Sequence, residues 1–296
     1  MTEDSSELTL ASPAKINVFL EVLGRRDDGF HELETVMLQT SLADQMWFRQ
    51  SPTADVSLTL APESDDQAAR GFPVDSSNLI IKAARLLQQH AAARQGTTIR
   101  VRKRIPAEAG LAGGSSNAAT TLLALNQLWQ LNLPKEELHG LAAQLGSDVN
   151  FFIEQCRAAV CRGRGERVEP VSLGETVHVV AARPTQGNAT PTVFRHTHLP
   201  ETAARRSAET MVSALRHGSP LQIQSQTFNR LTEAAAAGNP SMQDLMELMA
   251  TVLCRPAFMS GSGSTCFCYV DDPDQADSGV ALLRQHGVPF VAAMTC

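Results

Sequence analysis

The clearest candidate for chemistry is the glycine-rich stretch at residues 106–117, PAEAGLAGGSSN, which lies between a strand-like and a helix-like sequence. Gly110, Gly113 and Gly114 allow backbone N–H groups to turn toward one point, and the N-terminus of the following helix adds partial positive charge there. Ser115 and Ser116 add hydroxyl donors at the same place. The stretch therefore predicts a phosphate-binding loop, with a glycine turn followed by a serine cap as the alternative.

This loop differs from two better-known phosphate motifs. No Lys-Ser or Lys-Thr pair follows the glycines, as a P-loop requires. Gly113 and Gly114 are adjacent and no β-α-β nucleotide unit surrounds them, so a dinucleotide fingerprint is also excluded. A second glycine cluster at residues 259–265, MSGSGST, precedes an expected strand and suits a turn as well as a site.

Two charged residues stand out from apolar surroundings. Lys15 lies at the start of an apolar strand, where an unpaired ammonium would be costly, and Asp148 lies just past a helix end and ahead of Phe151 and Phe152. Each alone is best explained by a structural ion pair. Beside a phosphate loop, they suit a base and a charge stabiliser for phosphoryl transfer. The basic side chains of residues 100–104 are expected to form a solvated strand face.

The elements that must position these residues follow from periodicity. Residues 7–10, 16–23 and 36–42 predict strands, with a charged turn at 24–29, and residues 97–105 and 177–182 predict two more. A helix should follow the N-cap Asn78, a second the glycine loop, and a third should run from Pro134 to Gly146. Another helix is expected at 241–253, and the chain should end as strand 265–270, helix 275–286 and strand 288–292. Without regular βαβα alternation, an α+β fold is favoured, with a domain boundary near residues 165–175.

Bulk properties narrow the class. A chain of 296 residues suits two domains, and we expect them at residues 1–170 and 171–296. The net charge of -6 argues against a general nucleic-acid binder, and no apolar run approaches the roughly 20 residues that span a bilayer. The first ten residues lack a secretory pattern, so a cytoplasmic address is expected. The six cysteines form no zinc pattern and should be reduced and mainly structural.

Taken together, these segments resemble the galactokinase, homoserine kinase, mevalonate kinase and phosphomevalonate kinase superfamily. Its three motifs occur in order, at residues 13–17 (PAKIN), 106–116 and 260–264. Within that superfamily, residues 14–20, 26–33, 78–85, 146–152 and 190–194 are most similar to the 4-diphosphocytidyl-2-C-methyl-D-erythritol kinases of the non-mevalonate isoprenoid route. The resemblance covers residues from about 8 to about 292.

The resemblance implies an N-terminal β-α kinase domain, a C-terminal ferredoxin-like domain, a site between them, and phosphorylation by ATP with Mg²⁺ of the 2-hydroxyl of that cytidine substrate. It implies that Asp148 deprotonates the hydroxyl, that Lys15 steadies the attacking oxygen, and that Asn17 orients them. It also implies that His31 reads the cytosine edge while Phe30 and Phe194 flank the ring. The residues expected to bind ATP are Pro106, Gly110, Leu111, Ala112, Gly113, Gly114, Ser115 and Ser116.

The chain departs from the family pattern at several positions. Ala112 replaces a frequent glycine where φ can be positive, Phe30 replaces tyrosine, and Asn150 replaces proline. Arg230 interrupts a usual Asn-Asp-Leu-Glu run. No carboxylate is assigned to magnesium, so we expect the nucleotide to hold the metal. Two alternatives remain, a kinase of the same fold acting on homoserine or phosphomevalonate, and a nucleotide-binding relative without catalysis. The sequence leaves the oligomeric state open.

Overall fold

The computed structural model describes residues 7–199 and 205–296 of the chain and confirms the α+β fold class. The chain divides into two compact units, each built from more than one stretch of sequence. Unit 1 comprises Met1–Ala14, Ala43–Ala107 and Ala112–Gln155. Unit 2 comprises Lys15–Leu42, Glu108–Leu111 and Cys156–Cys296.

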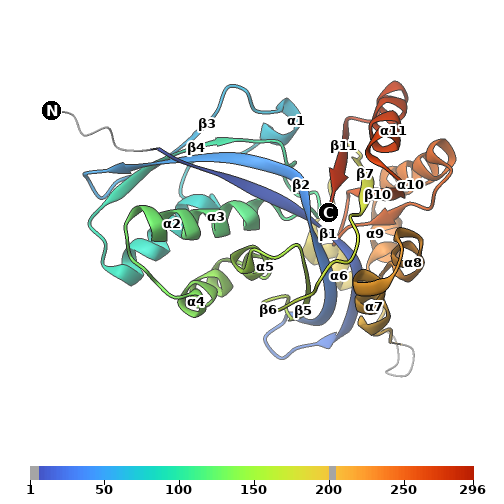
Figure 1. Ribbon diagram of the computed structural model, residues 1–296, viewed down its shortest axis with the longest axis horizontal. Helices are drawn as coiled ribbons and strands as arrows, with labels where there is room; N and C mark the ends of the chain where they lie inside the picture. The colour runs from blue at the N-terminus through green and yellow to red at the C-terminus, as the bar shows by residue number, and fades with distance from the viewer. Residues whose placement is uncertain (1–6, 200–204) are drawn as a thin grey trace. The chain divides into compact units, whose positions relative to one another are not determined.

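Most of the elements are labelled in Figure 1. The strands are β1 (Leu8–Arg25), β2 (His31–Ser51), β3 (Val56–Leu60), β4 (Gly96–Arg102), β5 (Ala158–Gly163), β6 (Arg167–Pro170), β7 (His178–Arg183), β8 (Phe228–Asn229), β9 (Phe258–Met259), β10 (Cys266–Val270) and β11 (Phe290–Thr295). The helices are α1 (Asp66–Ala69), α2 (Leu79–Ala91), α3 (Gly113–Leu128), α4 (Lys135–Leu145), α5 (Val149–Glu154), α6 (Thr190–His196), α7 (Glu209–His217), α8 (Pro220–Gln226), α9 (Thr232–Gly238), α10 (Pro240–Leu253) and α11 (Pro273–Gln285).

In unit 1, the second half of β2 pairs antiparallel with β4, from Gln45 opposite Arg102 to Ser51 opposite Gly96, and β3 lies parallel to β4. Helices α2 and α3 pack together beside this sheet (Figure 1). The sequence dictates α2 well, because Asn78 caps it by accepting the N–H of Ile80 at 2.9 Å. Side chains from β2, β4, α2 and α3, including Phe48, Ile99, Leu87 and Leu122, are fully buried in this core.

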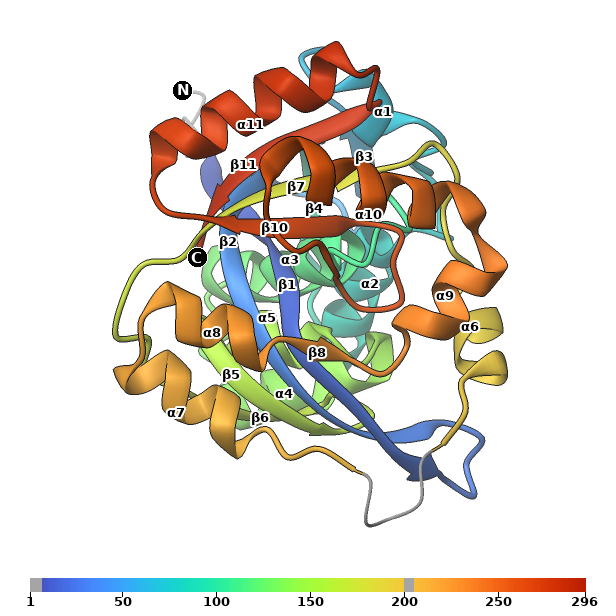
Figure 2. The ribbon, with the colours of Figure 1, turned by 90° about the vertical axis from the view of Figure 1, so that its right-hand side faces the viewer.

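In unit 2, the first half of β2 lies between β1 and β5, with Leu33 opposite Gly163 and Leu38 opposite Ala158. The strand order there is β6-β5-β2-β1-β8. A second, antiparallel sheet has the order β11-β7-β10-β9, and α10 and α11 lie side by side across it (Figure 2). This sheet and its helices form the expected ferredoxin-like part, and its core holds Val180, Met249 and Leu283.

The division of the chain into two units is discontinuous, whereas a single boundary near residue 170 is predicted from the sequence. The reason is the length of β1 and β2, with 18 and 21 residues, since each contributes residues to both units. The domain limits of 1–170 and 171–296 stay a prediction. No helix among the described residues is long and apolar enough to cross a membrane.

Candidate active site

The glycine-rich loop leads directly into α3. Ala112, the residue before this helix, has a φ of +55° in the left-handed region. A positive φ was expected there, because the family that the sequence resembles frequently has glycine at this position. The helix begins at Gly113, so the N–H groups of its first turn have no partner within the helix and carry its positive end. A Cβ atom at Gly113 would lie 2.8 Å from Ile105 Cγ2, which excludes larger side chains there. The loop thus offers backbone donors suited to phosphate.

The two serines of this helix start differ in their surroundings. Ser115 is partly exposed, whereas Ser116 is fully buried and its Oγ lies 2.8 Å from Ser12 Oγ. The Ser116 N–H donates to the carbonyl of Ala112. The Ser116 hydroxyl therefore stabilises the base of α3, while Ser115 and the exposed Gly114 remain open to solvent. Pro106 and Leu111 are buried, so their side chains support the loop from inside.

Lys15, Asn17 and Gly110 form a compact cluster within unit 2. The Lys15 ammonium donates to Asn17 Oδ1 at 2.5 Å and to the Gly110 carbonyl at 2.9 Å, although this side chain is 3% exposed. Asn17 Nδ2 donates to Thr35 Oγ1 at 2.8 Å. Gly110 has a φ of +73°, and a Cβ atom there would lie 2.2 Å from the Ser260 carbonyl. The ammonium is thus held in one direction by an amide oxygen and a backbone carbonyl.

Asp148 lies in unit 1, at the residue that precedes α5. Its side chain is partly exposed, and the two residues that follow it, Val149 and Asn150, are buried. α4 ends before Gly146, as the glycine at that position predicts. The carboxylate is therefore carried on the short turn between two helices. The structure assigns Asp148 and Lys15 to different units.

The three residues expected near the cytosine ring of the substrate form one stacked pair and one separate contact. The rings of His31 and Phe194 are stacked, with centroids 4.9 Å apart and planes inclined by 28°. Burial, and then the charge of Arg25, lower the pKa of His31, so its ring is neutral at pH 7. Phe30 is 50% exposed and lies under the guanidinium of Arg164, 4.8 Å from the ring centroid. The structure thus brings His31 and Phe194 together, and Phe30 pairs with Arg164 instead.

Comparisons with known proteins identify the family of the chain. The chain matches the family "GHMP kinases N terminal domain" at residues 78–155 and "GHMP kinases C terminal" at residues 211–288. A 4-diphosphocytidyl-2-C-methyl-D-erythritol kinase of Shouchella clausii is 37% identical over 264 residues, which are 89% of this chain and 86% of that protein. One of Rhodococcus jostii is 38% identical and covers 95% and 89%. The chain belongs to this family of GHMP kinases.

Solved structures extend the comparison to the fold. A crystal structure titled as 4-(cytidine 5'-diphospho)-2C-methyl-D-erythritol kinase superposes with a TM-score of 0.78 at 32% identity, covering 97% of this chain and 98% of that one. A homoserine kinase from Cytophaga hutchinsonii gives a TM-score of 0.70 at 15% identity, covering 100% and 95%. The second likeness shows the GHMP kinase fold alone. Homoserine and phosphomevalonate are not favoured as substrates, because the relatives of 37–38% identity are named for the cytidine substrate.

Two buried charged residues beside the glycine-rich loop were not recognised from the sequence. Lys103 is 3% exposed and forms an ion pair with Asp44, which is 1% exposed, so Lys103 does not belong to a solvated face. The parity of the strand could have revealed this, because Ile99, Val101, Lys103 and Ile105 share one side and all are buried. A basic residue at such a position predicts an internal partner.

The structure also shows the surroundings of the second glycine cluster and of Arg230. Gly261, from the second glycine cluster, lies so close to Lys15 and Asn17 that an added Cβ would be 3.3 Å from Lys15 Nζ and from Asn17 Oδ1. Arg230 pairs with the fully buried carboxylate of Glu21 through two contacts of 2.7 Å. Burial alone would raise the pKa of Glu21, but the hydrogen bond from Arg230 and two from backbone N–H groups lower it. Arg230 thus has a structural partner.

The remaining polar and thiol groups give no metal centre. Among residues 7–199 and 205–296, no group of three or more His, Cys, Asp or Glu side chains could hold a metal ion. No disulfide joins any of the six cysteines, all of which lie in the described part of the chain, and burial raises the pKa of Cys268 and of Cys296 to about 12. These thiols are therefore protonated and structural, as the sequence predicts.

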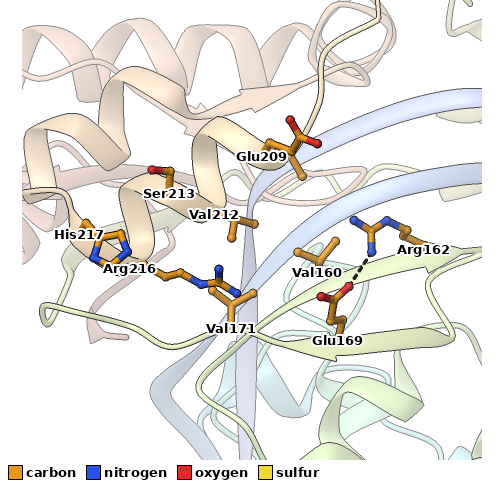
Figure 3. A pocket seen from close by; sticks show the side chains of 10 residues that line it. Val160, Arg162, Glu169, Val171, Glu209, Val212, Ser213, Arg216 and His217 are labelled. Atoms are coloured by element: carbon orange, nitrogen blue, oxygen red, sulfur yellow. Dashed lines mark hydrogen bonds and ion pairs between the residues drawn. The ribbon is translucent and has the colours of Figure 1, made fainter.

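A cavity of about 330 Å³ lies in unit 2 between β5, β6 and α7 (Figure 3). Valines such as Val160 and Val212 line it, and Arg162 crosses its edge to pair with Glu169 at 2.8 Å. None of the expected site residues of the kinase lines this cavity.

Proposed function

We propose that the chain transfers the γ-phosphoryl group of ATP to the 2-hydroxyl of 4-diphosphocytidyl-2-C-methyl-D-erythritol. The observation that carries this proposal is the 37–38% identity, over most of both chains, to kinases named for that substrate. The stacked His31 and Phe194 support it, because a planar base can use an aromatic face and a hydrogen-bonding ring. Homoserine and phosphomevalonate have no such base.

The proposed reaction depends mainly on position and charge. Asp148 accepts the proton of the attacking hydroxyl, whose oxygen bonds to the γ-phosphorus as the bond to the bridging oxygen of ADP breaks. Lys15, held by Asn17 and by the Gly110 carbonyl, stabilises the negative charge on the attacking oxygen. The N–H groups of Gly113, Gly114 and Ser115 hold the phosphates at the positive end of α3.

The resemblance also implies Mg²⁺, and the donor set limits how the ion could be held. The described residues contain no carboxylate cluster that fits a protein-built cage. In the proposal the ion is therefore bound by the phosphates of ATP, as Mg²⁺ commonly is. No step of the reaction above is assigned to it. We also propose a cytoplasmic location, to be checked by cell fractionation.

Coupled assay of ADP release tests this function. The purified protein should turn over ATP with the cytidine diphosphate substrate, and much more slowly with homoserine or phosphomevalonate at equal concentration. Preference for one of those two would replace the substrate assignment. Binding of ATP without turnover on any of the three would instead support a nucleotide-binding protein.

A further inference from the structure

The carboxylate of Asp44 lies on the inner side of β2 and accepts hydrogen bonds from four donors. Its Oδ1 accepts the backbone N–H groups of Arg104 at 2.7 Å and Ile105 at 3.0 Å. Its Oδ2 accepts from Asn117 Nδ2 at 2.9 Å and from the ammonium of Lys103. Charge-assisted hydrogen bonds of this kind are the strong ones, so the position of the carboxylate is well determined.

These donors come from the two segments that flank the glycine loop. Ile105 is the residue before the loop that starts at Pro106, and Asn117 is the fifth residue of α3, the helix that follows the loop. One side chain therefore fixes the point where the chain enters the loop and the first turns of the helix that follows it. Fixing both ends removes part of the conformational freedom that a flexible loop would lose on binding a ligand.

The hydrogen-bond network continues from Asn117 to the N-terminal turn of α3. Asn117 Oδ1 lies 3.2 Å from Lys103 Nζ, Asn117 Nδ2 donates to Ser12 Oγ at 2.8 Å, and Ser12 contacts Ser116. These four side chains and that of Asp44 are all buried. Lys103 Nζ lies 3.6 Å from the point that a Cβ of Gly113 would occupy, so the ammonium is placed under the first residue of α3.

A contribution to stability does not by itself explain such a pair. Removing two charges from water is costly, and apolar residues of similar volume commonly replace a buried ion pair without loss of stability. The partners of Asp44 suggest another reason, because three of them are the backbone N–H groups of Arg104 and Ile105 at the entry of the loop and the side-chain amide of Asn117 in the helix that follows it. Apolar side chains could fill the same space, but they could not hold those groups.

We propose that Asp44 is a positioning residue, which sets the conformation of the glycine loop for nucleotide binding by clamping its two ends and directing Lys103 beneath α3. This inference rests on the proposed role of the loop in binding the phosphates of ATP. Asp44 acts through the loop and does not touch the nucleotide.

The test is calorimetric titration of the whole chain with ATP, together with thermal unfolding. Asp44→Asn keeps the shape and an acceptor oxygen but leaves Lys103 without its counter-charge, and it should weaken ATP binding about 10- to 100-fold. In Asp44→Asn with Lys103→Met, both charges are gone, so the unfolding midpoint should return toward the wild-type value while ATP binding stays weak. If the ion pair were purely structural, the double variant would recover both the unfolding midpoint and the ATP affinity of the wild type.

Two further variants make the outcome unambiguous. The double variant should bind ATP more weakly than Lys103→Met alone, and equal affinity would show that Asp44 adds nothing. Leu87→Ala, a buried change on α2, should lower the unfolding midpoint with little change in ATP affinity. If Leu87→Ala weakened ATP binding as much as Asp44→Asn, general destabilisation would explain both.

The same titration separates this inference from the proposal beneath it. Gly113→Val places a side chain against Ile105 and should abolish ATP binding. If Gly113→Val bound ATP normally, the loop itself would not be the phosphate site. If Gly113→Val failed to bind while Asp44→Asn bound as wild type, the loop would stand and the positioning role of Asp44 would be overturned.

Discussion

At the level of single residues, the two charged candidates, Lys15 and Asp148, differ in how firmly the structure holds them. The Lys15 ammonium has two fixed acceptors, Asn17 Oδ1 and the Gly110 carbonyl. Asp148 instead lies between two helices and is partly exposed. A carboxylate on a turn can be replaced with little effect on the core, which makes Asp148 the better target for a kinetic test of the proposed base.

Asp148→Asn should therefore leave folding and ATP binding close to wild type while turnover falls by roughly 10²- to 10⁴-fold, the usual contribution of a positioned acid–base group. The measurement is kcat with the cytidine substrate, and circular dichroism reports the fold. Asp277→Asn, an exposed position on α11, is the matched control. Near wild-type turnover in a folded Asp148→Asn protein would remove the base from the mechanism.

Ala112 offers a residue-scale test of backbone strain. Its left-handed φ of +55° costs an L-residue roughly 1–2 kcal/mol, and glycine avoids that cost. Against this, glycine makes the unfolded chain more flexible, which lowers stability by about 0.4–1 kcal/mol. The net effect of Ala112→Gly should therefore be a stabilisation of about 0.5–1 kcal/mol. Urea unfolding measures this. Ala143→Gly, inside α4, should destabilise by about 1 kcal/mol, and a loss in both variants would contradict the strain argument.

At the scale of elements, His31 begins β2 and Phe194 belongs to α6, so their stack joins two segments distant in sequence. Because the pKa of His31 is lowered, the folded protein binds fewer protons here than the unfolded chain. The associated stability is present above the unfolded pKa of about 6.5 and is lost as pH falls through the lowered pKa.

The same titration should appear in substrate binding. The Michaelis constant for the cytidine substrate should stay constant from pH 8 to 7 and rise as imidazolium forms in acid. His31→Phe should remove that pH dependence while raising the constant by roughly 10-fold, the effect of one lost hydrogen bond. His90→Gln, on α2, is the control. An unchanged pH profile in His31→Phe would mean that another group titrates.

Regular elements were predicted well from sequence where a cap or a period fixed them. The helices after Asn78 and Pro134, the helix after the loop, and the closing strand, helix and strand all form near their expected positions. β5 and β6 were not predicted, because both strands are short, and because β5 pairs with β2, which lies far away in sequence, while β6 pairs with β5. Propensity carries little information about pairing at such distances.

The site was predictable by residue type more than by contact. The loop, Lys15 with Asn17, and His31 with Phe194 were all candidates from the sequence, but the pairs that they form were not predicted. Asp44 was missed altogether. It lies among Met46 and Phe48 on the buried side of a long strand, and a carboxylate there has meaning only once Lys103 is seen opposite it.

At the scale of the whole molecule, a ligand that binds only the folded chain should protect it from unfolding. ATP at 100 times its dissociation constant should stabilise the protein by about 2.7 kcal/mol, and the unfolding midpoint should rise by roughly 5 °C. Adenosine, which lacks phosphates, should give a much smaller shift. Equal shifts with both ligands would show that adenosine supplies the binding energy and that the phosphates, and so the loop, contribute little.

The stack of His31 on Phe194 has a consequence for how a substrate would be recognised. The imidazole already covers one face of the phenyl ring, so a base that uses this face must first displace it. Binding there is an exchange of one aromatic neighbour for another, and the net gain is the difference between two stacks. Weakly stacking rings would gain nothing from the exchange, so the free protein itself would discriminate among the molecules that approach it.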